Sequence, residues 1–157
     1  LDLVNKRMDE MVAELNLDGK TDIEKIEALY QFVMDRMEYV GYGQNTAHSP
    51  MGFILHGEGV CQAYAISLHM LLERVGIESR YIIGHIHQDQ VPEGEPTGHA
   101  WNMVKLDGKW YHLDSTWDDD SEDWLYYLVS DDFMELSRSW SKQYYESAPI
   151  SYDDLQT

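Results

Sequence analysis

A two-residue turn between two strand-like segments constrains the fold of this chain more than any other feature of its sequence. Residues 98–106 and 109–116 have the composition of β-strands, and the dipeptide between them, Asp107-Gly108, is one that hairpin turns prefer. The length of such a turn sets which residues of the two strands lie opposite each other. The sequence therefore predicts an antiparallel hairpin with a defined register.

This register brings together two residues that can carry chemistry. A two-residue turn pairs Leu106 with Lys109, and counting back along both strands places Trp101 opposite Asp114. His99 lies two residues from Trp101, so its side chain is on the same face of the hairpin. Its backbone is then a diagonal neighbour of Asp114 at about 7–8 Å, a gap that an imidazole and a carboxylate can close. We therefore expect a hydrogen bond between His99 and Asp114.

Helices are predicted ahead of this hairpin. Residues 22–38 have apolar residues at helical spacing, and Thr21 and Glu24 match a capping box. Residues 39–58 contain several glycines and no clear periodicity, which predicts a long loop, and 60–75 predict a second long helix that stops at Gly76. Helices followed by an antiparallel sheet define an α+β fold. The remaining expected elements are a helix at 3–15, strands at 79–87 and 125–129, and a short helix at 131–136.

Size and charge exclude several classes of protein. The chain has 157 residues, which suits one domain, and its formal net charge of −18 argues against binding to nucleic acid or an anionic membrane surface. No apolar run reaches the roughly 18–20 residues of a membrane span. A single cysteine allows neither an intrachain disulfide nor a four-cysteine zinc site. We therefore expect no structural metal and no cofactor.

That single cysteine, Cys61, stands at the predicted start of the second long helix. The segment before it contains Gly57 and Gly59. The first-turn N–H groups and the helix dipole favour a thiolate at this place, and the same N–H groups can stabilise an oxyanion. A histidine oriented by a carboxylate is a base that needs a partner of this kind. Cys61, His99 and Asp114 thus have the residue types for nucleophilic acyl transfer through a thioester.

The segments that carry these residues resemble the transglutaminase-like superfamily. The resemblance implies a papain-like core, in which a long helix carries the cysteine at its start and packs on an antiparallel sheet behind N-terminal helices. It also implies a Cys61–His99–Asp114 triad within a single domain, 1–157, whose motif core spans about 57–117. The matching segments are Gly59-Val-Cys-Gln-Ala-Tyr-Ala65, Gly98-His-Ala-Trp-Asn102 and Asp107-Gly-Lys-Trp-Tyr-His-Leu-Asp-Ser-Thr-Trp117.

The resemblance leaves the reaction open among three functions. The first is hydrolysis of peptide or amide bonds, as in a cysteine protease. The second is protein-glutamine transglutamination, in which an amine resolves the same thioester. The third is an inactive module that binds a peptide or the cell wall. We favour hydrolysis, because a domain this small has little room for a closed amine-acceptor tunnel.

Further residues are candidates for substrate binding. Tyr42 and Gln44 lie in the glycine-bearing loop before the cysteine helix, where a side chain can supply an oxyanion donor, and Gln62 follows the cysteine. Trp117 is the best candidate for lining a groove. Two other features suggest no ligand: His85 and His87 lack a third metal ligand, and the acidic run 118–123 lacks EF-hand spacing and is expected to be a solvated loop.

These features point to a protein or peptide substrate, with a cell-envelope peptide as one candidate. The chain begins with Leu1 and has no signal peptide, so we interpret it as a domain excised from a longer protein. The resemblance to bacterial members favours an extracellular or cell-envelope location in a bacterium. The single cysteine is equally compatible with the cytoplasm.

Overall fold

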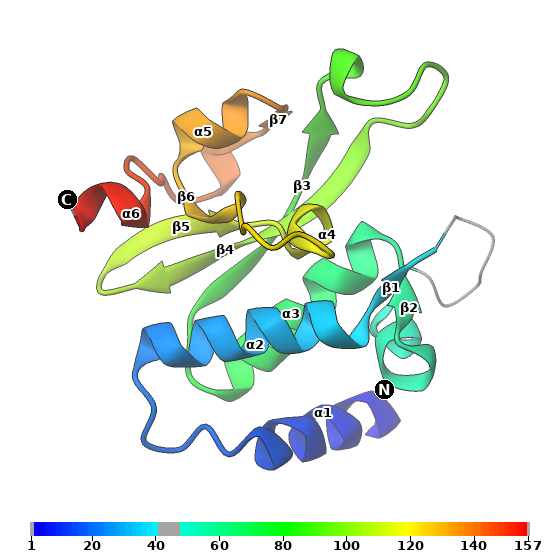
Figure 1. The fold of residues 1–157 in the computed structure, drawn as a ribbon, viewed down its shortest axis with the longest axis vertical. Helices are drawn as coiled ribbons and strands as arrows, with labels where there is room; N and C mark the ends of the chain where they lie inside the picture. Colours follow the sequence, from blue (N-terminus) through cyan, green and yellow to red (C-terminus); the bar gives the residue numbers. More distant parts are fainter. Residues whose placement is uncertain (1, 41–47, 157) are drawn as a thin grey trace.

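A layer of helices packs against an antiparallel sheet (Figure 1). The computed structural model describes residues 2–40 and 48–156. The helical layer consists of α1 (Asp2–Leu15), α2 (Asp22–Arg36) and α3 (Cys61–Arg74). Helix α3 is central, because it contacts α1 and α2 as well as strands of the sheet. The predicted α+β class is confirmed, and so is the long helix that begins at Cys61.

Local signals in the sequence explain where these helices begin and end. The Thr21 hydroxyl accepts a hydrogen bond from the Glu24 amide at 3.3 Å, and the Glu24 carboxylate accepts one from the Thr21 amide at 2.9 Å. This is the predicted capping box, and it satisfies two N–H groups that the first turn of α2 leaves free. Helix α3 ends just before Gly76, which has a φ of +80° and accepts the left-handed backbone that stops a helix.

The sheet has five strands in the order β6-β5-β4-β3-β7, and every neighbouring pair is antiparallel. Leu106 lies opposite Lys109 and Asn102 opposite Leu113, so the predicted hairpin register is confirmed. The strands are β3 (Ser79–Ile86), β4 (Gly98–Leu106), β5 (Lys109–Leu113), β6 (Tyr127–Val129) and β7 (Arg138–Trp140).

The expectation that the second hairpin strand continues to residue 116 is wrong. Strand β5 ends at Leu113, and a short helix, α4 (Ser115–Asp118), follows at once. Asp114 caps this helix, because its Oδ1 accepts a hydrogen bond from the Trp117 amide at 3.2 Å. The chain therefore turns at Asp114, and one carboxylate oxygen is committed to the turn while the other faces His99.

The segment expected to be a long loop, 39–58, contains short elements that lead to the cysteine. These are β1 (Glu38–Tyr39), a π-helical turn η1 (Gly52–His56) and β2 (Glu58–Gly59), which pairs with β1 in parallel. The Arg36 guanidinium at the end of α2 donates hydrogen bonds to the Phe53 and Ile54 carbonyls at 2.7 and 2.6 Å. The approach to Cys61 is thus tied to α2.

Gly57 ends the π-helical turn and must be glycine for two reasons. Its φ is +62°, a left-handed conformation that side chains disfavour. A Cβ at this position would also lie 2.5 Å from the Arg36 carbonyl oxygen. Close approach of the two backbones therefore sets the direction in which the chain enters α3.

Two apolar cores lie on the two faces of the sheet. The larger core fills the space between the helical layer and the sheet, and it includes Leu68, Leu71 and Val104. The smaller core contains Ile82, Trp101 and Met134 on the opposite face. Alternation along β4 produces this division, because side chains two residues apart share a face.

The C-terminal residues cover this second face, away from α1–α3 (Figure 1). They form α5 (Asp131–Glu135), β7 and a 3₁₀ turn η3 (Lys142–Tyr144). The last helix, α6 (Tyr152–Leu155), instead packs against the larger core through Tyr152, and a further turn, η2 (Gln88–Gln90), follows β3. The predicted strand at 125–129 and short helix at 131–136 are present within two residues of their expected bounds. Among the described residues, no helix has the length and apolar character needed to cross a membrane.

Candidate active site

Cys61 lies at the start of α3 and is packed against the sheet. Its side chain contacts a small cluster with Ala65 and Ala100, and the residue is 4% exposed. Val60, in an extended conformation, is the N-cap and supplies no side-chain hydrogen bond. The first amides of a helix have no intrahelical acceptor, so they are available to a negative charge held at this position.

His99 and Asp114 form the predicted hydrogen bond. The Nε2 atom of His99 lies 2.8 Å from Oδ2 of Asp114, and both side chains are buried. With Nε2 directed to the carboxylate, the other ring nitrogen, Nδ1, is the one available to a third group. The Cys61 side chain lies near this ring, since it also contributes to raising the pKa of His99 and both residues line the same two cavities. The structure therefore brings a thiol, an imidazole and a carboxylate together, with the imidazole hydrogen-bonded to the carboxylate.

The electrostatics of this chain favour a charged pair of His99 and Asp114. Burial acts against the imidazolium, yet the Asp114 carboxylate, with a smaller contribution from Cys61, raises the pKa of His99 to about 9. Burial also acts against the carboxylate, but His99 and Arg138 lower the pKa of Asp114 to about 2. At neutral pH the imidazole is therefore protonated and the carboxylate ionised.

Arg138 is a part of this site that sequence reasoning missed. Its Nη1 atom lies 2.5 Å from Oδ2 of Asp114, the same oxygen that faces His99. The residue belongs to β7, which joins the sheet beside β3. No motif marked it, because an arginine in the C-terminal part of a chain carries no signal of its partner.

Aromatic rings enclose the buried charges. The Trp101 ring stacks on His99 with centroids 6.0 Å apart, and the Trp117 ring lies 5.8 Å from His99. The Trp101 Nε1–H donates a 3.0 Å hydrogen bond to Nδ1 of His112, whose Nε2 lies 2.7 Å from the Asp131 carboxylate. This second buried histidine was also not predicted, and it holds the Trp101 ring that supports His99.

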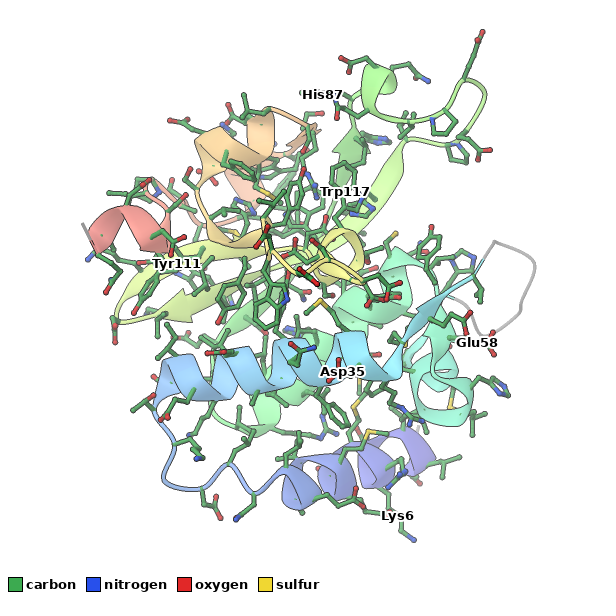
Figure 2. All side chains as sticks on the ribbon, viewed as in Figure 1. Lys6, Asp35, Glu58, His87, Tyr111 and Trp117 are labelled. Carbon is green, nitrogen blue, oxygen red and sulfur yellow. The ribbon has the colours of Figure 1, made fainter. Side chains whose placement is uncertain are left out.

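Two adjoining cavities open at Cys61 and His99. One has a volume of about 310 Å³ and includes Tyr39, Thr116 and Trp117 in its lining. The other has a volume of about 250 Å³ and includes Gln62, Tyr81 and Ile83. Both are also lined by Cys61, His99, Gly98 and Pro96, so they are two arms of one cleft with the thiol between them. Figure 2 labels Trp117, which belongs to the short helix α4, near β3 and β4.

The other predicted binding residues have different outcomes. Trp117 and Gln62 line the two arms of the cleft, as a substrate-contacting role requires. Gln62 Oε1 also lies 2.5 Å from Nδ1 of His48. Tyr42 and Gln44 lie outside the described residues.

The expectation that residues 118–123 form a solvated acidic loop is wrong for Asp118. This residue is 1% exposed, and its Oδ2 accepts a hydrogen bond from the Tyr30 hydroxyl at 2.5 Å. Both carboxylate oxygens also accept from the Tyr126 amide, at 3.0 and 3.1 Å. Burial raises the pKa of Asp118 to about 6, against these hydrogen bonds. The carboxylate therefore joins α2 to the turn that holds Asp114.

Among residues 2–40 and 48–156 the structure contains no group of three or more metal-binding side chains. His85 Nδ1 lies 3.1 Å from the Thr97 hydroxyl, and His87 lies beyond the end of β3. The two histidines thus do not form a shared site with a third ligand.

Comparison with known proteins gives a consistent assignment. The sequence model of the transglutaminase-like superfamily matches residues 9–115. Kyphoscoliosis peptidase from Homo sapiens is 26% identical over 118 residues, which cover 70% of this chain and 18% of that protein. The mouse protein of the same name is 25% identical over 122 residues, 73% of this chain and 18% of its own length. The chain thus spans about a fifth of these relatives.

Two solved structures have a similar fold. The structure named "a Putative Cysteine Protease from Cytophaga hutchinsonii" has a TM-score of 0.57 and 20% identity, with 71% of this chain and 37% of that chain covered. The structure named "a TGase" has a TM-score of 0.60 and 11% identity, with 92% and 37% covered. The chain belongs to the transglutaminase-like superfamily, because the family match covers more than half of its residues and the fold agrees. The sequence-based resemblance is confirmed.

Proposed function

We propose that this domain is a cysteine enzyme that transfers acyl groups through a thioester, with Cys61 as nucleophile, His99 as acid and base, and Asp114 as the residue that orients His99. The observation that supports this proposal is the hydrogen-bonded His99–Asp114 pair, with the Cys61 thiol beside His99 in the lining of both arms of the cleft. Membership of a superfamily with cysteine-based enzymes supports it independently.

In the first half of the reaction, the Cys61 thiolate attacks the carbonyl carbon of the substrate. The C–N bond is retained in the tetrahedral intermediate, whose oxyanion accepts hydrogen bonds from amides at the start of α3. The His99 imidazolium then gives its proton to the leaving nitrogen, and the C–N bond breaks. An amine or ammonia departs, and the acyl group stays on sulfur as a thioester.

In the second half, neutral His99 accepts a proton from water, whose oxygen attacks the thioester carbon. Collapse of this second intermediate breaks the C–S bond and releases a carboxylic acid. The cysteine and histidine return to the thiolate–imidazolium pair. Asp114 stays ionised and keeps Nε2 of His99 in place, so that Nδ1 faces the sulfur and the substrate.

The test of this proposal is the rate at which Cys61 reacts with an alkylating reagent as a function of pH, in the parent chain and in His99→Ala. An ordinary thiol is mostly protonated below about pH 8 and reacts slowly there. We expect fast alkylation in the parent down to about pH 5–6, since a protonated His99 stabilises the thiolate, and loss of this reaction in His99→Ala. Slow reaction that rises only near pH 8–9 in both proteins would contradict the proposal.

We favour water over an amine as the molecule that attacks the thioester. No acidic side chain is among the described residues that line the two arms of the cleft, so nothing in these linings would attract the cationic amine of a lysine. We expect a glutamine peptide incubated with a labelled primary amine to release ammonia faster than it gains label. Label incorporation that outruns ammonia release would favour transglutamination instead, the activity to which the superfamily name and the TGase neighbour point.

A further inference from the structure

Arg138 is a charged side chain buried in the second core, beside the residues proposed to do chemistry. It is 0% exposed, and its strand, β7, pairs with β3 so that Arg138 lies opposite Ile86. The residue lies outside the part of the chain that matches the superfamily model, which ends at residue 115.

Those contacts hold the guanidinium in one place. Nη1 donates to Asp114 Oδ2 at 2.5 Å, and Nε donates to the Ser137 hydroxyl at 3.1 Å. The guanidinium carbon lies 4.5 Å from the centre of the Trp117 ring and 4.9 Å from that of Trp101, so ring faces cover the cation on two sides. The Nη2 atom is buried and has no hydrogen-bond partner among the described residues.

An arrangement of this kind is not explained by stability. A buried ion pair loses the hydration of both charges, and an apolar pair of similar volume is often as stable or more so. The unpartnered Nη2 adds to this cost. A guanidinium does supply something that no apolar side chain can. It carries a positive charge at every pH at which a protein stays folded.

That constant charge matters because the proposed reaction changes the charge of His99. While His99 is protonated, Asp114 has two cationic neighbours that share its Oδ2 atom. When His99 gives its proton to the leaving nitrogen, one of the two neighbours becomes neutral. Without Arg138, the fully buried Asp114 carboxylate would then have no counter-ion. This would raise the proton affinity of the His99–Asp114 pair, so His99 would release its proton less readily.

We propose that Arg138 is a positioning residue that keeps Asp114 an anion in both protonation states of His99, so that His99 can release its proton. This inference rests on the proposed function for its place in a reaction. The charge balance itself is a property of the folded chain and is measured without substrate.

Other titratable groups face this site and must be separated from His99. The pKa of Asp118 is about 6, so this carboxyl group is predominantly ionised in a titration that begins at pH 7. Burial lowers the pKa of His112, which is therefore neutral over the same range. Burial raises the pKa values of Tyr30 and Tyr126. The Cys61→Ala substitution removes the thiol from the titration. Asp131 is the remaining acidic neighbour. Burial acts to raise its pKa, but hydrogen bonds with His112 and the Ala148 amide lower the pKa overall.

The experiment is an NMR titration of His99 from pH 7 to 10.5 in the full chain carrying Cys61→Ala, with the signal assigned by its loss in His99→Ala. Arg138→Met removes the charge at similar length, and Arg138→Lys is the matched control that keeps it. We expect the pKa of His99 to rise by at least about one pH unit in Arg138→Met, a tenfold gain in proton affinity. In Arg138→Lys we expect a smaller rise than in Arg138→Met, because the ammonium keeps a cation beside Asp114 over the lower part of this pH range.

An unchanged pKa in a folded Arg138→Met chain would overturn the proposal, because Arg138 would then only fill space. A fall in the pKa of His99 would also overturn it, since it would show that Asp114 had left its position. Neither result would affect the alkylation test of Cys61, so the two proposals fail separately.

If Arg138→Met does not fold, a double variant decides between the two explanations. If Arg138→Met with Asp114→Asn folds where Arg138→Met alone does not, the chain fails through an uncompensated carboxylate, as the proposal requires. If the double variant also fails to fold while Arg138→Lys with Asp114→Asn folds, the lost side chain matters for packing alone, and the proposal is wrong.

Discussion

Cys61→Ala is expected to lower kcat/KM for amide hydrolysis by roughly 10⁴-fold or more, because it removes the atom that forms the thioester. Cys61 is the only thiol in the chain, so no neighbouring cysteine can replace it. Alanine fits the small cluster with Ala65 and Ala100, so the fold should be retained. Hydrolysis of a peptide amide, measured with the parent and variant at equal concentration, checks the expected loss.

The matched control for this variant is Ser67→Ala. Ser67 lies six residues further along the same helix, is fully buried, and its hydroxyl has no hydrogen-bond partner among the described residues. Its loss should leave kcat/KM within about threefold of the parent value. If Cys61→Ala keeps both the turnover and the biological effect of the parent, Cys61 is not a nucleophile. A parent chain without turnover, whose biological effect survives Cys61→Ala, would make a binding module the better interpretation.

Asp114→Asn is expected to lower kcat by roughly 10³–10⁴-fold while the thiol stays in place, a loss of the size seen when the carboxylate of a triad is neutralised. Asp114 is what raises the pKa of His99 to about 9 against the effect of burial. With a neutral amide in its place, burial dominates and the pKa of His99 falls below its ordinary value. The imidazolium then loses its proton at a lower pH than in the parent, and fast alkylation of Cys61 at neutral pH is lost with it.

This variant needs a check on folding, because it leaves Arg138 buried without its carboxylate. Such a loss typically destabilises a protein by about 3–5 kcal/mol, so thermal unfolding should be measured beside activity. Asp118→Asn is the matched control: it neutralises a second buried carboxylate in the same turn, one that bonds Tyr30 rather than His99. If folded Asp114→Asn retains kcat within tenfold of Asp118→Asn, Asp114 does not orient the base.

Much of the scaffold could be predicted because its signals are local. The Asp107-Gly108 turn set the register of β4 and β5, and this register brought His99 to Asp114. The capping box at Thr21 and the stop at Gly76 marked helix ends for the same reason, since caps involve residues only a few positions apart. The wrong end of the second hairpin strand also has a local cause. An aspartate after a strand is equally suited to cap a helix, and Asp114 caps α4 instead of continuing β5.

The surroundings of the site depended on contacts between residues far apart in the chain. Arg138 reaches Asp114 only because β7 joins the sheet next to β3, and Asp118 is buried only because α2 brings Tyr30 over it. A charged residue in a sequence gives no sign of a partner 24 or 88 positions away. The sequence by itself determined the thiol at a helix start and the His–Asp pair on a hairpin. Tertiary packing alone decided which buried charges surround them, because burial and pairing are properties of the assembled layers.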